Sequence, residues 1–226
     1  MSNLKPLTLY THATGPNPWK VNILLEELGI PYEAKFMDMA VLHQEEYEAT
    51  NPNGRVPAIV DPNTDITLWE SGAIVEYLIQ TYDKQEALHY HKAPERFLTQ
   101  QYLHFQVSGQ GPYFGQAAWF ANFHSEKIPS AVERYNNEIR RVTKVLDGVL
   151  QKKGGKSLVG DKVTYADLAF VPWYWLISFI DQSGALEKEL NEKNPAWSAW
   201  IKELNARPAV KKCFDHRNAK MQEMHK

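Results

Sequence analysis

The pattern of hydrophobic and polar positions changes near residue 85. Before that point, short apolar runs alternate with segments whose apolar residues recur at helical spacing. The order of these signals is strand, helix, strand, short helix, strand, strand, helix, which is typical of an α/β domain with a mixed sheet. We predict strands at 7–11, 32–38, 56–61 and 66–69, a helix from about 19 that stops at Gly29, and another at 70–82.

After the polar stretch 83–95, strand signals disappear and long helical patterns follow. We predict helices at about 94–123, 130–152, 164–180 and 195–222, the later ones separated by "KKGGKS" and "NEKNP". The third begins with Thr164 and has Asp167 three residues further on, the spacing of a capping box. The chain is therefore predicted to hold an α/β domain at 1–85 and an all-α domain at 94–226.

Composition restricts the class of protein more than its function. The 226 residues are 43% hydrophobic and 23% charged, as in an ordinary soluble protein. A net charge of −2 gives no reason to expect nucleic acid as a partner. No apolar run reaches the roughly 18 residues of a membrane span, and the first residues do not resemble a signal peptide. One cysteine, Cys213, fits a reducing compartment, so we expect a cytoplasmic protein.

Several short motifs along the chain resemble those of a known family. The segment "NGRVPAI" (53–59) is similar to a Val-Pro turn, "WESGAI" (69–74) to a Glu-Ser turn and "TYADLAF" (164–170) to a helix-initiating box, all of the glutathione transferases. A fourth motif, "SGQGPYFGQAAWF" (108–120), and the opening "THATGPNPWKV" (11–21) resemble a narrower group. That group holds the yeast nitrogen regulator with prion behaviour, its filamentous-fungal relatives and the bacterial nu-class enzymes. The resemblance covers nearly the whole chain.

The resemblance implies a fold, a ligand and an assembly. It implies a thioredoxin-like N-terminal domain that binds glutathione, as substrate or cosubstrate, and an all-α domain that contributes the second-substrate pocket and the interface of a homodimer. No metal is expected, because no cluster of His, Cys or Asp has metal-ligand spacing. The yeast regulator has an Asn-rich extension ahead of this fold, whereas this sequence starts almost at the first predicted strand. We therefore expect no prion or regulatory role by that route.

Val56, Glu70 and Ser71 are the first residues that the resemblance assigns to glutathione, an acidic tripeptide with a central thiol. A cis Val56–Pro57 bond would turn the N–H and C=O of Val56 outward, so that they pair with the cysteinyl residue like an added strand. Glu70 and Ser71 start a helix, where unpaired N–H groups and the helix dipole favour an anion. Ser71 would hold the γ-glutamyl carboxylate and Glu70 its ammonium. An ordinary turn proline and two helix-capping residues are the structural alternative.

The glycine carboxylate of glutathione has two candidate partners. Arg55 directly precedes the Val-Pro pair, and its planar guanidinium can donate two parallel hydrogen bonds to a carboxylate. His43, in the segment after the second strand, matches its family position only after a shift of one residue. A solvated surface histidine is the alternative for that position.

Asn17 stands before a proline, where thiol enzymes of related folds carry a cysteine. As a structural residue it could cap the helix, with Pro18 as the first helical residue. As a catalytic residue it could donate a hydrogen bond to the glutathione sulfur, whose pKa the helix N-terminus would also lower. The nucleophile would then arrive with the substrate. Tyr10, Thr11 and Thr14 are hydroxyl-bearing alternatives within reach of the same loop.

The second substrate, a small hydrophobic or disulfide compound, is assigned to the helical domain. Tyr113 and Phe114 follow "SGQGP" on a long predicted helix and are the candidates for its pocket. Aromatic residues at helical spacing are also common in cores. Cys213 lies on an amphipathic helix near the C-terminus, where we expect a buried or idle thiol.

Three functions are compatible with these residues. The first is an enzyme that conjugates glutathione to electrophiles, as in detoxification, or reduces disulfides or peroxides with it. The second is a ligand carrier or regulatory binding protein of the same fold with little turnover. The third is an interaction module such as those attached to translation factors, which the lack of another domain in the sequence disfavours. The intact ligand contacts favour the enzyme.

Overall fold

The computed structural model describes residues 4–224, which form two compact units. The first unit runs to Ala87 and takes up the chain again from Ala206, and the second comprises Leu88–Asn205. None of the helices in the described range is long and apolar enough to cross a membrane.

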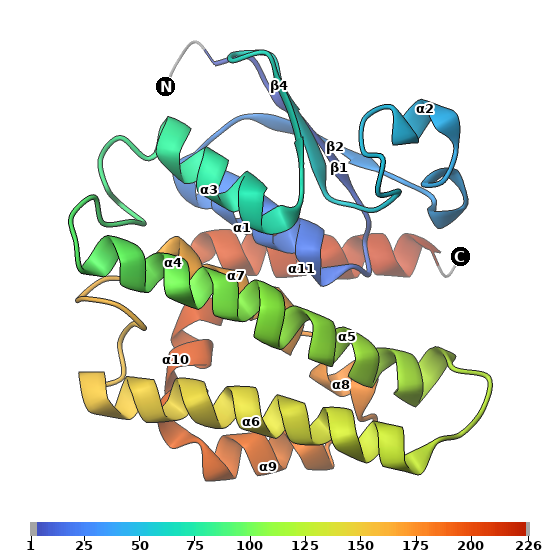
Figure 1. Cartoon of the computed structure of the whole chain (residues 1–226), viewed down its shortest axis with the longest axis vertical. Helices are drawn as coiled ribbons and strands as arrows, with labels where there is room; N and C mark the ends of the chain where they lie inside the picture. The colour runs from blue at the N-terminus through green and yellow to red at the C-terminus, as the bar shows by residue number, and fades with distance from the viewer. Residues whose placement is uncertain (1–3, 225–226) are drawn as a thin grey trace. The chain divides into compact units, whose positions relative to one another are not determined.

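A four-stranded mixed sheet forms the centre of the first unit, as the sequence predicts. Its strands lie in the order β2-β1-β3-β4, with β1 parallel to β2 and antiparallel to β3, and β3 antiparallel to β4. Their bounds are Leu7–Thr11 for β1, Tyr32–Phe36 for β2, Ala58–Asp61 for β3 and Ile66–Trp69 for β4. The parallel pair β1–β2 requires a crossover, which α1 (Pro16–Leu28) provides. In Figure 1, α1 and α3 (Ser71–Tyr82) lie side by side, and the two helices are in contact.

The ends of α1 follow from its sequence. Gly29 ends the helix in the left-handed conformation, with φ 63°, and its N–H bonds back to the last turn. The start differs from the expectation that Asn17 caps the helix and Pro18 opens it. The helix begins at Pro16 after Gly15, because a proline at the first position already has helical φ and loses no helical hydrogen bond there. Asn17 is therefore the second helical residue and not the cap.

Between β2 and β3 the chain forms only short helices. These are a 3₁₀ helix η1 (Met39–Val41) and α2 (Glu45–Glu48). Asp38 starts η1 by accepting a hydrogen bond of 2.9 Å from the N–H of Ala40. This segment carries His43, one of the two candidates for the glycine carboxylate.

The last helix, α11 (Pro208–Met224), belongs to the first unit, whereas the sequence prediction placed it in an all-α domain at 94–226. Two ion pairs tie this segment to α1. Arg207 donates two hydrogen bonds of 2.6 Å to the carboxylate of Glu27, and Lys212 donates one of 2.7 Å to Glu26. The predicted single helix at 195–222 is wrong, because the structure has two helices there, α10 (Pro195–Asn205) and α11. It is divided ahead of Pro208, because a residue before proline is disfavoured in the helical conformation.

The second unit is entirely helical over its described residues. Its helices are α4 (Glu95–Phe105), the π-helix η2 (Gln106–Gln110), α5 (Gly111–Ala118), the π-helix η3 (Trp119–Phe123), α6 (Pro129–Lys153), α7 (Tyr165–Tyr174), α8 (Ile177–Ile180), α9 (Ala185–Lys193) and α10 (Pro195–Asn205). The first four form one continuous run that matches the predicted helix at 94–123. The predicted helix at 164–180 is split into α7 and α8, and α9 was not predicted.

The capping box at the start of α7 is confirmed. The carboxylate of Asp167 accepts hydrogen bonds from the N–H and the hydroxyl of Thr164, at 2.8 and 2.7 Å. It also accepts from the N–H of Leu158 at 2.9 Å and from the indole of Trp200 at 3.1 Å. Burial raises the pKa of Asp167, and these four donors oppose that effect. One buried carboxylate thereby connects the start of α7 to a loop and to α10.

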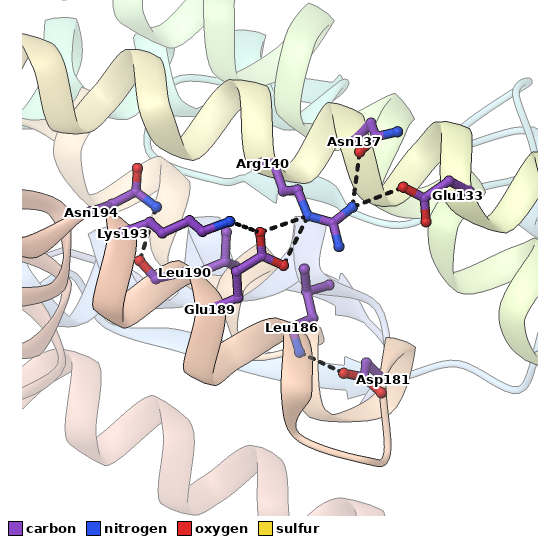
Figure 2. Close-up of polar contacts among 9 residues, drawn as sticks. All are labelled: Glu133, Asn137, Arg140, Asp181, Leu186, Glu189, Leu190, Lys193 and Asn194. Carbon is purple, nitrogen blue, oxygen red and sulfur yellow. Dashed lines mark hydrogen bonds and ion pairs between the residues drawn. The ribbon is translucent and has the colours of Figure 1, made fainter.

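Helices α6 and α9 are joined at the surface by a group of polar side chains, shown in Figure 2. The Nε of Arg140 lies 3.1 and 3.0 Å from the two carboxylate oxygens of Glu189. Lys193 donates to the same carboxylate at 2.9 Å, and another guanidinium nitrogen of Arg140 reaches Asn137 and Glu133. Surface ion pairs of this kind each contribute little to stability.

Candidate functional site

The register of the sheet brings the segments that carry most of the predicted glutathione contacts to the same end of three neighbouring strands. Tyr10 of β1 is opposite Ala58 of β3, and Ala58 is opposite Trp69 of β4. The segments that follow Tyr10 and Trp69, and the one that precedes Ala58, therefore emerge together. They are the loop into α1, the start of α3 and the Val-Pro turn, which carry the candidate residues Asn17, Val56, Arg55, Glu70 and Ser71.

The loop of residues 12–15 is held by its own hydrogen bonds. The indole of Trp19 donates to the carbonyl of Ala13 at 2.9 Å. The N–H of Thr14 donates to Nδ1 of His12 at 3.3 Å, and the Thr14 hydroxyl lies 3.0 Å from the same nitrogen. Burial lowers the pKa of His12, with a smaller opposing effect of Asp38. Nδ1 of His12, as the acceptor for the Thr14 N–H, therefore helps to fix the loop shape.

Asn17 is half-buried in the first turn of α1. The first N–H groups of a helix lack helical partners and carry a partial positive charge, so an anion placed next to Asn17 is stabilised. The side-chain amide adds a hydrogen-bond donor at the same place. This arrangement suits a thiolate supplied by a ligand.

The three alternative hydroxyls differ in their surroundings. The Thr14 hydroxyl is already engaged with His12. The Tyr10 ring is half-buried, and packs edge-on against Tyr47 with ring centres 5.5 Å apart. Thr11 is fully buried, and its hydroxyl has no hydrogen-bond partner among the described residues. Of the three, Thr14 is exposed but engaged with His12, Tyr10 is half-buried, and Thr11 has unused hydrogen-bonding capacity but is buried.

Glu70 and Ser71 form the start of α3. Ser71 is its first residue and is 6% exposed, whereas Glu70 is exposed and precedes the helix. Glu70 has φ 69° and ψ 111°, a backbone conformation that costs a non-glycine residue on the order of 1–3 kcal/mol. Its side chain makes no capping hydrogen bond to the helix. The N–H groups of the first turn are thus left to another acceptor.

The Val56–Pro57 bond is cis, which confirms the sequence prediction. Val56 is half-buried and lies just before β3. Within the described structure its main-chain N–H and C=O have no hydrogen-bond partner. They are available to pair with an extended peptide.

His43 and Arg55 are brought to the same place, on either side of Gly54. The carbonyl of Arg55 accepts from the hydroxyl of Tyr47 at 2.7 Å, which fixes the main chain while the side chain is exposed. Gly54 has φ 60°, and a Cβ there would lie 2.3 Å from Nδ1 of His43. Only glycine therefore permits this approach. The His43 side chain is 75% exposed and lies 3.7 Å from Glu48.

Lys20 is a residue of this region that the sequence analysis missed. It lies one turn into α1, is 3% exposed, and has its pKa lowered to about 7 by burial, with an opposing attraction from Glu70. The signal was present in the sequence, because Lys20 interrupts an apolar helix on the face that also carries Ile23 and Leu24.

The two candidates for the second-substrate pocket are placed differently. Phe114 has 0% of its surface exposed, and its ring packs edge-on against Trp173 and Tyr174, so the structure gives it a packing role in the second unit. Tyr113 is half-buried, with its ring near that of Tyr135 and under the guanidinium of Arg141. A substrate contact by Tyr113 stays a prediction.

A cavity of about 390 Å³ lies in the first unit beside the loop that leads to α1. Its lining combines three methionines and a phenylalanine with two carboxylates and one ammonium group. Its lining consists of His12, Ala13, Phe36, Met37, Asp38, Met39, Lys220, Glu223 and Met224. Cavities of roughly 300–1,000 Å³ with this mixture are typical of small-molecule sites. The described residues contain no group of three His, Cys, Asp or Glu arranged for a metal ion.

Comparison with known proteins agrees with the motifs. Residues 5–80 match the family model "Glutathione S-transferase, N-terminal domain" and residues 114–217 match "Glutathione S-transferase, C-terminal domain". The Aspergillus fumigatus "Glutathione S-transferase-like protein tpcF" is 45% identical, over 94% of this chain and 96% of the relative. "Protein URE2" of Saccharomyces bayanus is 36% identical, over 93% of this chain and 70% of the relative.

Solved structures give the same result. The glutathione transferase URE2P6 from Phanerochaete chrysosporium, in complex with oxidized glutathione, is 46% identical and has a TM-score of 0.89. The match covers 97% of this chain and all of that structure, 100%. The relatives thus fall in the narrower group to which the motifs point.

Proposed function

Because this chain belongs to the glutathione S-transferase family, we propose that its first unit binds glutathione and uses the bound thiolate as a nucleophile. The observation that carries the proposal is the row formed by Tyr10, Ala58 and Trp69 across the sheet. This row brings together the N-terminus of α1, the unpaired main-chain N–H and C=O of Val56, and the N-terminus of α3. That set of groups matches a peptide with a thiol and two terminal carboxylates.

Each part of glutathione has a partner under this proposal. The N–H and C=O of Val56 pair with the main chain of the cysteinyl residue. The N–H and hydroxyl of Ser71 hold the γ-glutamyl carboxylate at the positive end of α3, and the exposed carboxylate of Glu70 accepts from the neighbouring ammonium. Arg55, which follows Gly54, and His43, whose ring lies against Gly54, are the candidates for the glycine carboxylate at the far end.

Asn17 acts on the sulfur. The partial positive charge at the start of α1 and the side-chain amide of Asn17 both stabilise the thiolate more than the thiol, so the pKa of the bound thiol is lower than about 8.5. A larger fraction of glutathione is then nucleophilic at neutral pH. The protein supplies a positive electrostatic potential and a hydrogen-bond donor, and glutathione supplies the reacting sulfur.

The thiolate can be used in two ways. In conjugation, the sulfur forms a bond to an electrophilic carbon, and a leaving group departs with its electron pair or, after addition, the product takes a proton. In disulfide reduction, the sulfur attacks one sulfur of the disulfide and releases the other as thiolate. A second glutathione then resolves the mixed disulfide, so that two glutathiones are oxidised to one glutathione disulfide while the substrate disulfide becomes two thiols.

The second substrate has a place beside the loop. The cavity next to His12 and Ala13 has an apolar wall of Phe36 and methionines, which suits a small hydrophobic electrophile. Lys220 and the His12 ring line the same cavity and can donate hydrogen bonds to a polar group on that molecule. We include in the proposal that the protein acts as a cytoplasmic homodimer.

The alternative function is a binding protein that holds glutathione or its conjugates with little turnover. It uses the same contacts except that of Asn17 with the sulfur. The thiol pKa of the bound ligand distinguishes the two functions, because a carrier has no need to lower it.

The test combines binding and turnover. Glutathione and S-methylglutathione are titrated calorimetrically, and glutathione-dependent turnover is measured with a dinitrohalobenzene, a hydroxyalkyl disulfide and an organic peroxide. Binding with turnover of at least one substrate is the expected result. Binding without any turnover supports the carrier, and the absence of binding contradicts both functions.

A further inference from the structure

Trp19 is a fully buried residue of α1 whose side chain reaches back to the loop ahead of the helix. It is the fourth residue of α1, and its indole Nε1 donates a hydrogen bond of 2.9 Å to the carbonyl of Ala13. Helical side chains lean towards the N-terminus of their helix, so a long side chain in the first turn of α1 covers the preceding loop. The indole thereby joins the helix to the loop of residues 12–15.

The side chain of the N-cap residue does not make this connection in α1. An N-cap side chain ordinarily accepts a hydrogen bond from the first turn, but the N-cap here is Gly15, which has no side chain. His12 and Thr14 bond to each other within the loop. The hydrogen bond from Trp19 therefore ties the loop to the helix where a capping side chain would otherwise do so.

The indole of Trp19 is held in this orientation by two other rings. Its ring centre lies 5.7 Å from that of His216 in α11 and 6.4 Å from that of Phe36 at the end of β2. The rings of His216 and Phe36 are themselves 5.5 Å apart, and α11 lies against α1 (Figure 1). A side chain packed in this way loses these contacts if it turns away from the loop, so the donor is preorganised.

The segment that this hydrogen bond closes contains the groups proposed to act on the glutathione sulfur. Asn17 and the first N–H groups of α1 lie between Ala13 and Trp19 along the chain. Donors stabilise an anion best when they are fixed before the charge arrives, because donors that have to reorganise lose part of their effect. A tie across residues 13–19 therefore bears directly on how well this helix start stabilises a thiolate.

We propose that Trp19 is a positioning residue for the glutathione thiolate: its indole N–H holds the Ala13 carbonyl, and so keeps the loop and Asn17 in the geometry that stabilises the bound sulfur. This inference rests on the proposed function. Because Trp19 is 0% exposed, it acts through the loop and the helix start and not by touching the ligand.

The proposal separates chemistry from binding. Without the indole donor, the loop can shift relative to the first turn of α1, and the thiolate loses stabilisation that the neutral thiol does not need. The pKa of the bound thiol should then rise towards about 8.5, and kcat at neutral pH should fall about 10-fold. Affinity for S-methylglutathione, which has no thiol, should stay unchanged, because Val56, Glu70 and Ser71 lie on other segments.

The experiment compares Trp19→Phe with Trp175→Phe. Trp19→Phe keeps an aromatic ring against His216 and Phe36 but has no donor, whereas Trp175→Phe removes an indole hydrogen bond of 2.8 Å to Asn205 in the second unit. Ultraviolet absorbance gives the pKa of bound glutathione, calorimetry gives the affinity for S-methylglutathione, and thermal unfolding gives the stability. We expect a raised thiol pKa and slower turnover only in Trp19→Phe, with unchanged affinity for S-methylglutathione in both variants.

Three results overturn the role of Trp19. The first is an unchanged thiol pKa in Trp19→Phe, even with a lower melting temperature, because the indole then serves stability alone. The others are an equal rise of the pKa in Trp175→Phe, and a loss of S-methylglutathione affinity as large as the loss of turnover. If the unaltered protein binds no glutathione, or its bound thiol titrates like the free one, the proposed function itself is contradicted and the role of Trp19 with it.

A second variant covers the case in which Trp19→Phe does not fold. The analogue β-(3-benzothienyl)alanine has the two-ring shape of tryptophan but carries a sulfur in place of the N–H. It is introduced at position 19 and, as the control, at position 175. The pKa of bound glutathione should rise only with the analogue at position 19, and a pKa equal to that of the unaltered protein overturns the proposal.

Discussion

Glu70, before α3, and Lys20, in α1, are each in a situation that is unfavourable for their residue type. Glu70 adopts a positive φ of 69°, and Lys20 is a lysine at 3% exposure. Neither is needed for a helix or a strand to form, and each costs stability that the surrounding packing has to offset. Such costs gather at functional sites, and Glu70 is one of the two residues expected to bind the γ-glutamyl group.

Glu70→Gln and Ser71→Ala should each weaken glutathione binding by about 1–3 kcal/mol, the typical effect of losing a hydrogen bond to a charged group. Glu76→Gln, further along α3, is the matched control and should bind normally. Calorimetric titration measures the affinity and thermal unfolding measures stability. Normal affinity with a lower melting temperature would assign Glu70 and Ser71 to helix capping instead.

The ionisation of Lys20 should appear in the pH dependence of stability. Its folded-state pKa of about 7 lies below its ordinary value, so the unfolded chain binds more protons between these two values. The stability of the unaltered protein relative to Lys20→Met should therefore be constant below pH 7 and rise from pH 7 to pH 10. Urea unfolding of both proteins at several pH values measures this difference, and a flat difference means that Lys20 is not desolvated.

At the scale of elements, α7 depends on a single carboxylate. Asp167 is fully buried and accepts four hydrogen bonds, from Thr164, Leu158 and Trp200. Asp167→Ala should lower the free energy of unfolding by about 3 kcal/mol or more, because several buried donors lose their acceptor together. Asp215→Ala, an exposed carboxylate of α11, is the control and should change it by less than about 0.5 kcal/mol. Equal effects of the two substitutions would contradict the assigned role of Asp167.

The sequence predicts most elements because their patterns are local. The four strands and α3 lie within two residues of the predicted bounds at each end, since apolar runs and turn residues define them. The helix that was missed and the helix whose break was missed also have causes in their local sequence. Helix α9 is short and highly polar, so it has little apolar periodicity, and the break before Pro208 was concealed by helical patterns on both sides.

The candidate site could be predicted only in part. The motifs around Val56 and Glu70 are visible in the sequence because they combine unusual neighbours, and the structure brings them to one edge through the strand register. Lys20 was missed although it interrupts the apolar face of α1 that carries Ile23 and Leu24, because that pattern alone does not show whether the lysine side chain is buried. The role of Phe114 was equally undetermined, since an aromatic residue on a helix can face a core or a pocket.

At the scale of the whole molecule, the chain order and the compact units do not coincide. The first unit contains both the N-terminal α/β segment and α11, which is attached to α1 through Arg207 and Lys212. A fragment ending near residue 87 therefore lacks part of the unit that carries the site. We predict that such a fragment binds glutathione at least about 10-fold more weakly than the full chain, because α11 supports the helix that holds Asn17. Titration calorimetry with the two proteins checks this, and equal affinities would show that α11 is dispensable.

Assembly is a second prediction at this scale. Family membership leads us to expect a homodimer at micromolar concentration, and sedimentation velocity measures the mass directly. Sedimentation as a monomer of 26.0 kDa would contradict it.

The central claim is that the start of α1 and Asn17 hold glutathione as a thiolate. Ultraviolet absorbance of the thiolate, followed as the complex is titrated with base, measures the pKa of the bound thiol. The account predicts a pKa at least about one unit below the value of about 8.5 for a free thiol, and a return towards that value in Asn17→Ala. The affinity of Asn17→Ala for S-methylglutathione should stay unchanged. A bound thiol that titrates like free glutathione, or a lowered pKa that survives Asn17→Ala, would contradict the claim.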